Sequence, residues 1–191
     1  VFLMGGDMER ARVRFEETRA LHPNAPSVYV DLARVANRRA EQRMRLAGEF
    51  GLPPGADAKA ALAKAKTNAH RAIELCEPLP AAYYALAQSA FLRAEGAEAA
   101  ERDGTHDWNS VREHLEAALR YGVRERAAVR RMLARACIAL DDIDCAETAL
   151  QRAAEAAPED REVWRLFHLL AQAHSRQDAF IDALSYNLGR L

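Results

Sequence analysis

A stripe of small, large and small side chains recurs along this chain and limits its fold more than any other sequence feature. Near the N-terminus, GGDMERARVRFEETRALHP places Ala11, Phe15 and Thr18 at positions i, i+4 and i+7, on one face of a helix. The segment DDIDCAETALQRAAEAAP repeats that spacing, and a proline ends both segments. One helix pair cannot bury such a stripe alone, so its recurrence predicts stacked units. The later copies are Ala65, Ala69 and Ala72; Val111, Leu115 and Ala118; and Ala146, Leu150 and Ala153.

A second type of helix is expected after each striped helix. It begins with an aromatic residue and carries a Leu-Ala pair three residues later, as in Tyr29 followed by Leu32 and Ala33. The small residue lets two helices approach closely, and the aromatic ring fills the gap to the next unit. The other copies are Tyr83 with Leu86 and Ala87, Arg130 in the aromatic position with Leu133 and Ala134, and Trp164 with Phe167 and His168.

These residues resemble the tetratricopeptide repeat, a 34-residue pair of helices A and B. The step from Ala134 to His168 has that period, whereas earlier steps of 54 and 47 residues predict insertions between helix A and helix B. The resemblance implies an all-α, right-handed superhelix of antiparallel helical hairpins. It implies about five units, at 1–25, 26–79, 80–125, 126–159 and 160–191, with the first truncated, the last a cap, and the whole a piece of a longer chain.

Helix signals divide the chain in the same way. Capping-box spacing at Ser110 to Glu113 and at Asp144 to Glu147 predicts helix starts, with Asp144 as the N-cap residue. The stretches 27–47 and 81–102 are expected to be long A helices. The segments that follow them, with Phe50 and Leu52 on the first, would form a lip at one edge.

Composition excludes several classes of function. Half of the residues are hydrophobic but only 7% are aromatic, which favours closely packed helices, and the net charge of −1 offers no broad field for nucleic acid. No apolar run reaches the roughly 20 residues that a membrane span needs. The chain has three cysteines, and an odd number cannot form a complete disulfide framework, so a reducing compartment is favoured. The compartment stays open between the cytoplasm, which the cysteines favour, and the periplasm, if an upstream signal has been removed.

Motifs for catalysis or for cofactors are not expected. The pairs His168 with His174 and His106 with His114 lack the i, i+4 spacing of a zinc site, and Gly5 and Gly6 lack the strand, third glycine and lysine of a phosphate loop. The acidic cluster around Cys145 is interpreted as a helix start. The sequence therefore predicts no metal, no cofactor and no enzymatic activity.

The resemblance also implies which residues meet a partner, because the inward face of the A helices lines the groove in that family. The five arginines of this face suit carboxylates, and Tyr or Phe suits extended backbone or apolar side chains. An acidic peptide with an apolar anchor is therefore the expected partner, unless the arginines pair with acids of adjoining helices. The positions are Arg34, Asn37, Arg38, Tyr84, Gln88, Phe91, Arg131, Arg135, Arg165 and Gln172.

A non-catalytic scaffold that binds a partner protein is the expected function. Two alternatives stay open. The chain could be the interaction region of a larger enzyme or envelope-assembly protein. It could also resemble the helical-repeat proteins that accompany periplasmic transporters and bind a small apolar ligand, in a tunnel near Tyr84, Phe91, Trp108 and Trp164.

Overall fold

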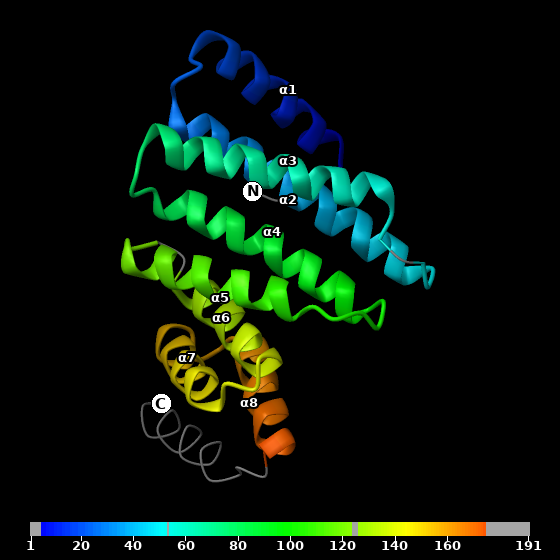
Figure 1. Ribbon diagram of the computed structural model, residues 1–191, viewed down its shortest axis with the longest axis vertical. Helices are drawn as coiled ribbons and strands as arrows, with labels where there is room; N and C mark the ends of the chain where they lie inside the picture. The colour runs from blue at the N-terminus through cyan, green and yellow to red at the C-terminus, as the bar shows by residue number, and fades with distance from the viewer. Residues whose placement is uncertain (1–4, 53, 124–125, 175–191) are drawn as a thin grey trace.

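In the described part of the structure, the helices stack one after another in the order of the sequence (Figure 1). The computed structural model describes residues 5–52, 54–123 and 126–174, and every regular element within these ranges is an α helix. The predicted all-α class is confirmed. The helices are α1 (Gly5–Leu21), α2 (Pro26–Glu49), α3 (Ala56–Leu75), α4 (Pro80–Glu98), α5 (Thr105–Arg120), α6 (Arg126–Ala139), α7 (Ile143–Ala156) and α8 (Arg161–His174).

Consecutive helices form antiparallel hairpins that stack into a solenoid. The most extensive packing joins α2 to α3, α4 to α5 and α6 to α7, and each hairpin also rests on the next. Helices α2, α4, α6 and α8, which we call the A helices, contact one another in succession. The result is consistent with the tetratricopeptide-like solenoid that the resemblance implies, and the proposed unit boundaries stay a prediction.

The predicted stripe lies in the core. Ala65, Ala69 and Ala72 of α3 are fully buried, and so are the stripe residues of α5 and α7. On the A helices, Ala33, Ala87 and Ala134 are likewise 0% exposed. The first copy, in α1, is only partly buried because, among the described helices, α1 packs on α2 alone.

The aromatic residue that opens an A helix has a polar role beyond packing. Tyr29 Oη donates to Pro23 O at 2.9 Å, Tyr83 Oη to Glu77 Oε1 at 2.8 Å, and Trp164 Nε1 to Pro158 O at 2.8 Å. Each acceptor lies six residues earlier, in the turn before the helix. The ring therefore ties each of these A helices to its own preceding turn.

The extra residues of the early units lengthen helices rather than loops. Helices α2 and α3 have 24 and 20 residues, against 14 each for α6 and α7. Helix α4 ends at Glu98, four residues before the expected end at Arg102, because the Arg102 amide turns back to Ala97 O and Glu101 adopts φ +52°. At the tip of the α2–α3 extension, Phe50 and Leu52 are 77% and 61% exposed.

Two predicted caps are wrong. Asp142, not Asp144, is the N-cap of α7, because its Oδ1 accepts the Cys145 amide at 3.1 Å. Ser110 lies inside α5, whose N-cap position is Gly104 rather than Ser110, and the Ser110 hydroxyl donates to His106 O.

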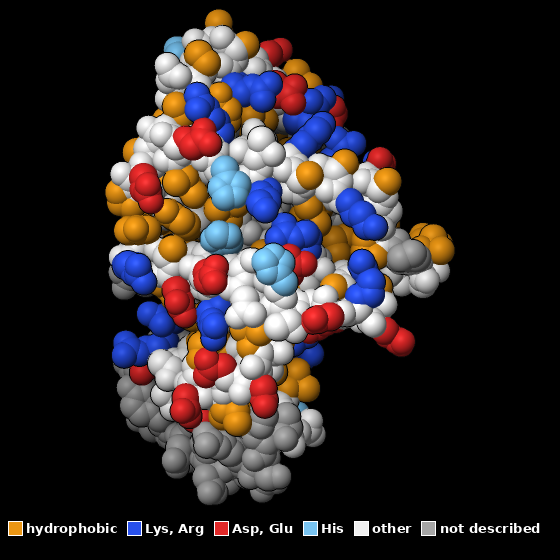
Figure 2. All heavy atoms as spheres, in the orientation of Figure 1, with side chains coloured by type: hydrophobic (Ala, Val, Ile, Leu, Met, Phe, Trp, Pro, Cys, Tyr) orange, Lys and Arg blue, Asp and Glu red, His pale blue; other side chains and the backbone are white. Residues whose placement is uncertain are grey.

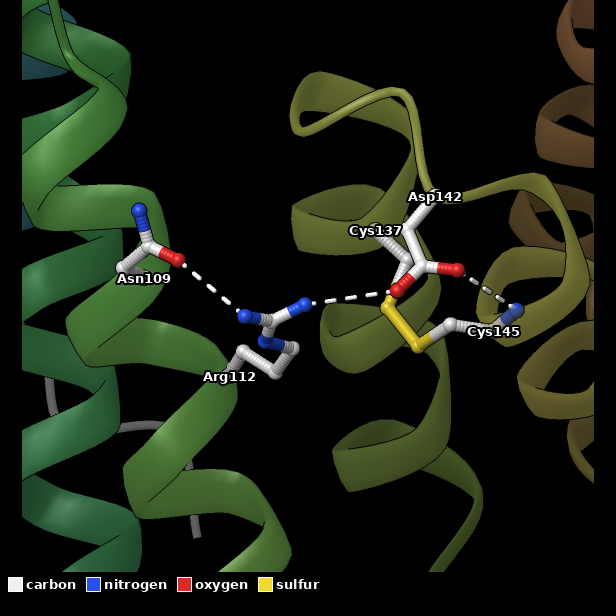
Figure 3. Close-up of a disulfide and its surroundings, with 5 residues drawn as sticks. All are labelled: Asn109, Arg112, Cys137, Asp142 and Cys145. Atoms are coloured by element: carbon white, nitrogen blue, oxygen red, sulfur yellow. Dashed lines mark hydrogen bonds and ion pairs between the residues drawn. A yellow bond between two sulfur atoms is a disulfide. The ribbon is translucent and has the colours of Figure 1, made fainter.

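Cys137 and Cys145 form a disulfide, which the odd number of cysteines and the interpretation of Cys145 as part of a helix start did not predict. It joins α6 to the first turn of α7, across a Cα–Cα distance of 5.8 Å (Figure 3). Asp142 lies beside it and also accepts from Arg112 of α5 at 3.3 Å, so the neighbouring hairpin contacts the same turn. Cys76 is exposed and is free of a disulfide.

Opening the disulfide should destabilise the α6–α7 hairpin. We expect reduction, or the substitution Cys145→Ser, to lower the unfolding free energy by about 2–3 kcal/mol, since the unfolded chain regains the freedom of the closed loop. Thermal unfolding followed by circular dichroism should show a Tm lower by roughly 5–10 °C. Cys76→Ser is the matched control and should leave Tm unchanged. Equal Tm values with and without reductant would contradict the linkage.

Candidate partner-binding groove

The A helices together line one groove with a volume of about 620 Å³. Nine of the ten predicted residues line it, from α2 across α4 and α6 to α8. Gln172 is the exception, because it lies exposed on α8 and is not part of the lining. The inward face predicted from the repeat spacing is thus brought together in space.

Three of the predicted binding residues hold neighbouring A helices together. Asn37 of α2, only 4% exposed, donates from Nδ2 to Ala85 O of α4 at 2.8 Å and accepts from the buried Ser89 hydroxyl at 2.7 Å. Arg135 of α6 donates to Glu98 Oε2 at the end of α4 at 2.7 Å. Arg131 of α6 donates to Asp160 Oδ2, just before α8, at 2.6 Å. We call these contacts the inter-helix latches, one for each step between A helices.

The middle latch includes an aromatic residue. The Arg135 guanidinium carbon lies 5.1 Å from the centroid of the Trp108 ring, and Trp108 Nε1 donates to the other oxygen of Glu98 at 2.9 Å. Phe91 meets Trp108 edge to face at 5.4 Å between centroids. Arg135 is therefore engaged on two sides, by a carboxylate and by an aromatic face.

Three carboxylates that the sequence interpretation missed also line the groove. They are Glu41, Glu95 and Glu162. Glu162 forms an ion pair with Arg165 at 2.6 Å, one turn away on α8. Extending the inward face by one helical turn from Arg38, Phe91 and Arg165 would have found all three. The groove is thus less positive than the arginines alone indicate.

Glu95 has an altered proton affinity. Its side chain stays accessible to solvent but lies inside the groove, where desolvation raises the pKa of its carboxyl above the ordinary 4.5. Arg135 opposes this shift, whereas the charges of Glu98, Glu41 and Glu162 add to it. The carboxylates converge on this part of the groove from three helices.

Arg38 differs from the other arginines of this groove in its ion pairing. Arg131, Arg135 and Arg165 have acidic partners within 2.7 Å, and Arg34 lies 4.0 Å from Asp31. Arg38 is exposed and, among the described residues, has no ion pair. Phe91 and Gln88 of α4, both partly exposed, line the same groove. An incoming carboxylate could meet Arg38 without displacing an internal partner.

The rings expected to form an apolar tunnel do not line one cavity in the described structure. Tyr84 and Phe91 line the groove, but Trp108 is 2% exposed and forms part of the core. Trp164 stacks on Phe167 at 5.7 Å. The groove is therefore a mixed polar and aromatic surface.

No group of three or more potential metal ligands occurs among the described residues. In the same part of the chain, none of the helices combines the length and apolarity that crossing a bilayer requires.

Comparison with known families supports the repeat interpretation. Residues 105–173 match the family model described as tetratricopeptide repeat. This match supports the predicted resemblance to the tetratricopeptide repeat. The tetratricopeptide match spans α5 to α8, where the helices have the shorter lengths, and such repeats generally mediate protein–protein interaction. No curated protein matches the chain.

Removing the Asn37 latch should destabilise the fold. We expect Asn37→Ala to lower the unfolding free energy by about 1–3 kcal/mol, because buried polar groups on α4 lose their partner. Denaturant unfolding measures the change. Asn68→Ala, at a partly exposed position on α3, is the control and should stay within about 0.5 kcal/mol of the wild type. A loss no larger than that of the control would show that Asn37 is not a latch.

Glu95 should make stability depend on pH in a defined direction. The pKa of Glu95 is higher in the folded protein than in the unfolded chain, where it is near 4.5. The stability that this difference provides is therefore fully present below pH 4.5 and is lost as the pH rises through the folded pKa, where the carboxyl ionises in the groove. Glu95→Gln should therefore gain stability over the wild type at pH 7, and the gain should shrink toward pH 4. Urea unfolding at both pH values tests this. A difference that does not vary with pH would contradict the assignment.

Proposed function

We propose that the chain is a non-catalytic scaffold that holds a segment of a partner protein in the groove of the A helices. The observation that supports this best is the presence of nine predicted lining residues around one cavity of about 620 Å³. The tetratricopeptide match adds that such repeats generally bind proteins or peptides.

The charged and aromatic residues of the groove indicate which kind of partner segment would bind. Arg38 offers a charge that has no ion pair with any described residue, and Phe91 and Gln88 provide an aromatic surface and an amide in the same groove. Further along, Glu41, Glu95 and Glu162 would repel a second acidic group. We therefore propose a segment with a carboxylate at the Arg38 end and an apolar anchor over Phe91, rather than one that is acidic throughout.

Arg38→Glu is the variant that tests the groove. Reversing the charge of Arg131 or Arg135 would break an inter-helix latch. A loss of binding in such a variant could therefore come either from lost recognition or from a disturbed fold. Arg39 is the matched control, because it is adjacent, exposed and 3.8 Å from Glu9 of α1, and it lines a different cavity.

The experiment starts from a displayed library of random peptides selected on the wild-type protein. We expect the enriched peptides to combine an acidic residue with an apolar anchor. Their affinity, measured by calorimetry, should fall about tenfold or more with Arg38→Glu, the cost of one charge-assisted hydrogen bond, and change less than twofold with Arg39→Glu. Equal losses in the two variants, or no enrichment at all, would overturn the proposal.

A further inference from the structure

A second cavity lies at the edge of the solenoid, between the long helices of the first two complete hairpins. We call it the edge slot. Its volume is about 490 Å³, within the range of roughly 300–1,000 Å³ that small-molecule sites occupy. Helices α2, α3 and α4 and the start of α5 line it, so it exists only because α2 and α3 extend beyond the length of the later hairpins.

The floor of the edge slot is apolar. It consists of Met44 of α2, Pro54 of the α2–α3 turn, Leu62 and Ala63 of α3, and Leu92 of α4. Gly96 lets these elements meet, because a Cβ at that position would lie 3.0 Å from Met44 Cε and 3.3 Å from Pro54 Cγ. The close approach of α4 closes the slot on one side and leaves an apolar surface facing its interior.

Positive charge surrounds this floor. All three lysines of the chain lie in α3, and two of them, Lys59 and Lys66, line the slot together with Arg102 of the α4–α5 turn. Lys59 and Lys66 are two helical turns apart, about 10 Å along the axis, on one face of α3. In Figure 2, where α3 faces the viewer, Lys and Arg side chains flank hydrophobic ones in the hollow beside it.

The acids of the slot do not neutralise these cations. Asp107 accepts from Arg93 Nε at 2.8 Å, and Asp103 accepts the Thr105 amide at 2.8 Å. Lys59, Lys66 and Arg102 are exposed and have no ion pair with any residue that the structure describes. Among the described residues, four cations and two carboxylates line the slot, which thus combines an apolar interior with a net positive charge.

We propose that the edge slot binds an anionic amphiphile, a molecule with a carboxylate or phosphate head and an apolar chain. The chain would lie over Met44, Leu62 and Leu92, and the head would meet Lys59, Lys66 or Arg102. Such a ligand both covers the apolar floor of the slot and places a negative charge next to its cations. A neutral or cationic ligand would cover the apolar floor only. The site is separate from the partner-binding groove and does not rest on the function proposed for it.

Calorimetry with decanoate below its micellar concentration tests this proposal. We expect saturable binding at one site, with decan-1-ol and acetate at least tenfold weaker, because each lacks one half of the required chemistry. Lys66→Glu should weaken decanoate binding at least tenfold. Lys64→Glu, with the same charge change two residues away, lines a different cavity and should leave binding within about twofold.

A blocking variant tests the position of the chain. Ala63 is exposed toward the slot, so Ala63→Trp should fill it without disturbing the core and abolish decanoate binding. Circular dichroism checks the fold of each variant, and Lys59→Glu replaces Ala63→Trp if the latter does not fold.

Three results would overturn the proposal. The first is an equal affinity for decanoate and decanol. The second is unchanged binding in Lys66→Glu. The third is binding to phosphatidylglycerol vesicles without binding to monomeric decanoate, which would assign the cations to a membrane surface instead.

Discussion

Close contact between helices through alanine is the constraint on which the rest of this structure depends. Each helix from α2 to α7 has at least one alanine with no exposed surface, such as Ala33, Ala69, Ala87 and Ala134. A larger side chain at such a position would separate the helices or force neighbouring side chains from their rotamers, at a cost of typically 1–3 kcal/mol. The spacing between A helices sets the width of the groove, so the alanines fix the geometry of the candidate site without touching a partner.

The sequence allowed the all-α fold to be predicted from helical periodicity, and the resemblance to the tetratricopeptide repeat supplied most of the groove lining. Once the resemblance assigns the inward face of each A helix, residues as far apart as Arg34 and Arg165 can be placed on one surface. The roles of those residues could not be predicted in the same way. Whether Asn37 faces a partner or the carbonyl of Ala85 depends on the offset between two helices, which periodicity within one helix does not determine.

Other features escaped prediction for similar reasons. The disulfide depends on how tightly the chain turns between α6 and α7, and that turn includes Asp141 at φ +58°, a conformation more often found at glycine. With Asp141 in this conformation, the helix begins at Ile143 and Asp142 becomes the cap. The edge slot depends on the approach of Gly96 to Met44, two residues more than fifty positions apart in sequence, neither of which belongs to a recognisable motif.

The two cavities show opposite ways of handling charge. The groove pairs most of its arginines with acids, whereas Lys59, Lys66 and Arg102 of the edge slot have no ion pair with any described residue, and Leu92 forms part of the wall of both. The inter-helix latches differ in the same respect. The step from α2 to α4 is held by neutral hydrogen bonds, while the steps from α4 to α6 and from α6 to α8 are held by ion pairs. Salt screens only the latter, so rising ionic strength should weaken the two C-terminal steps between A helices more than the N-terminal step.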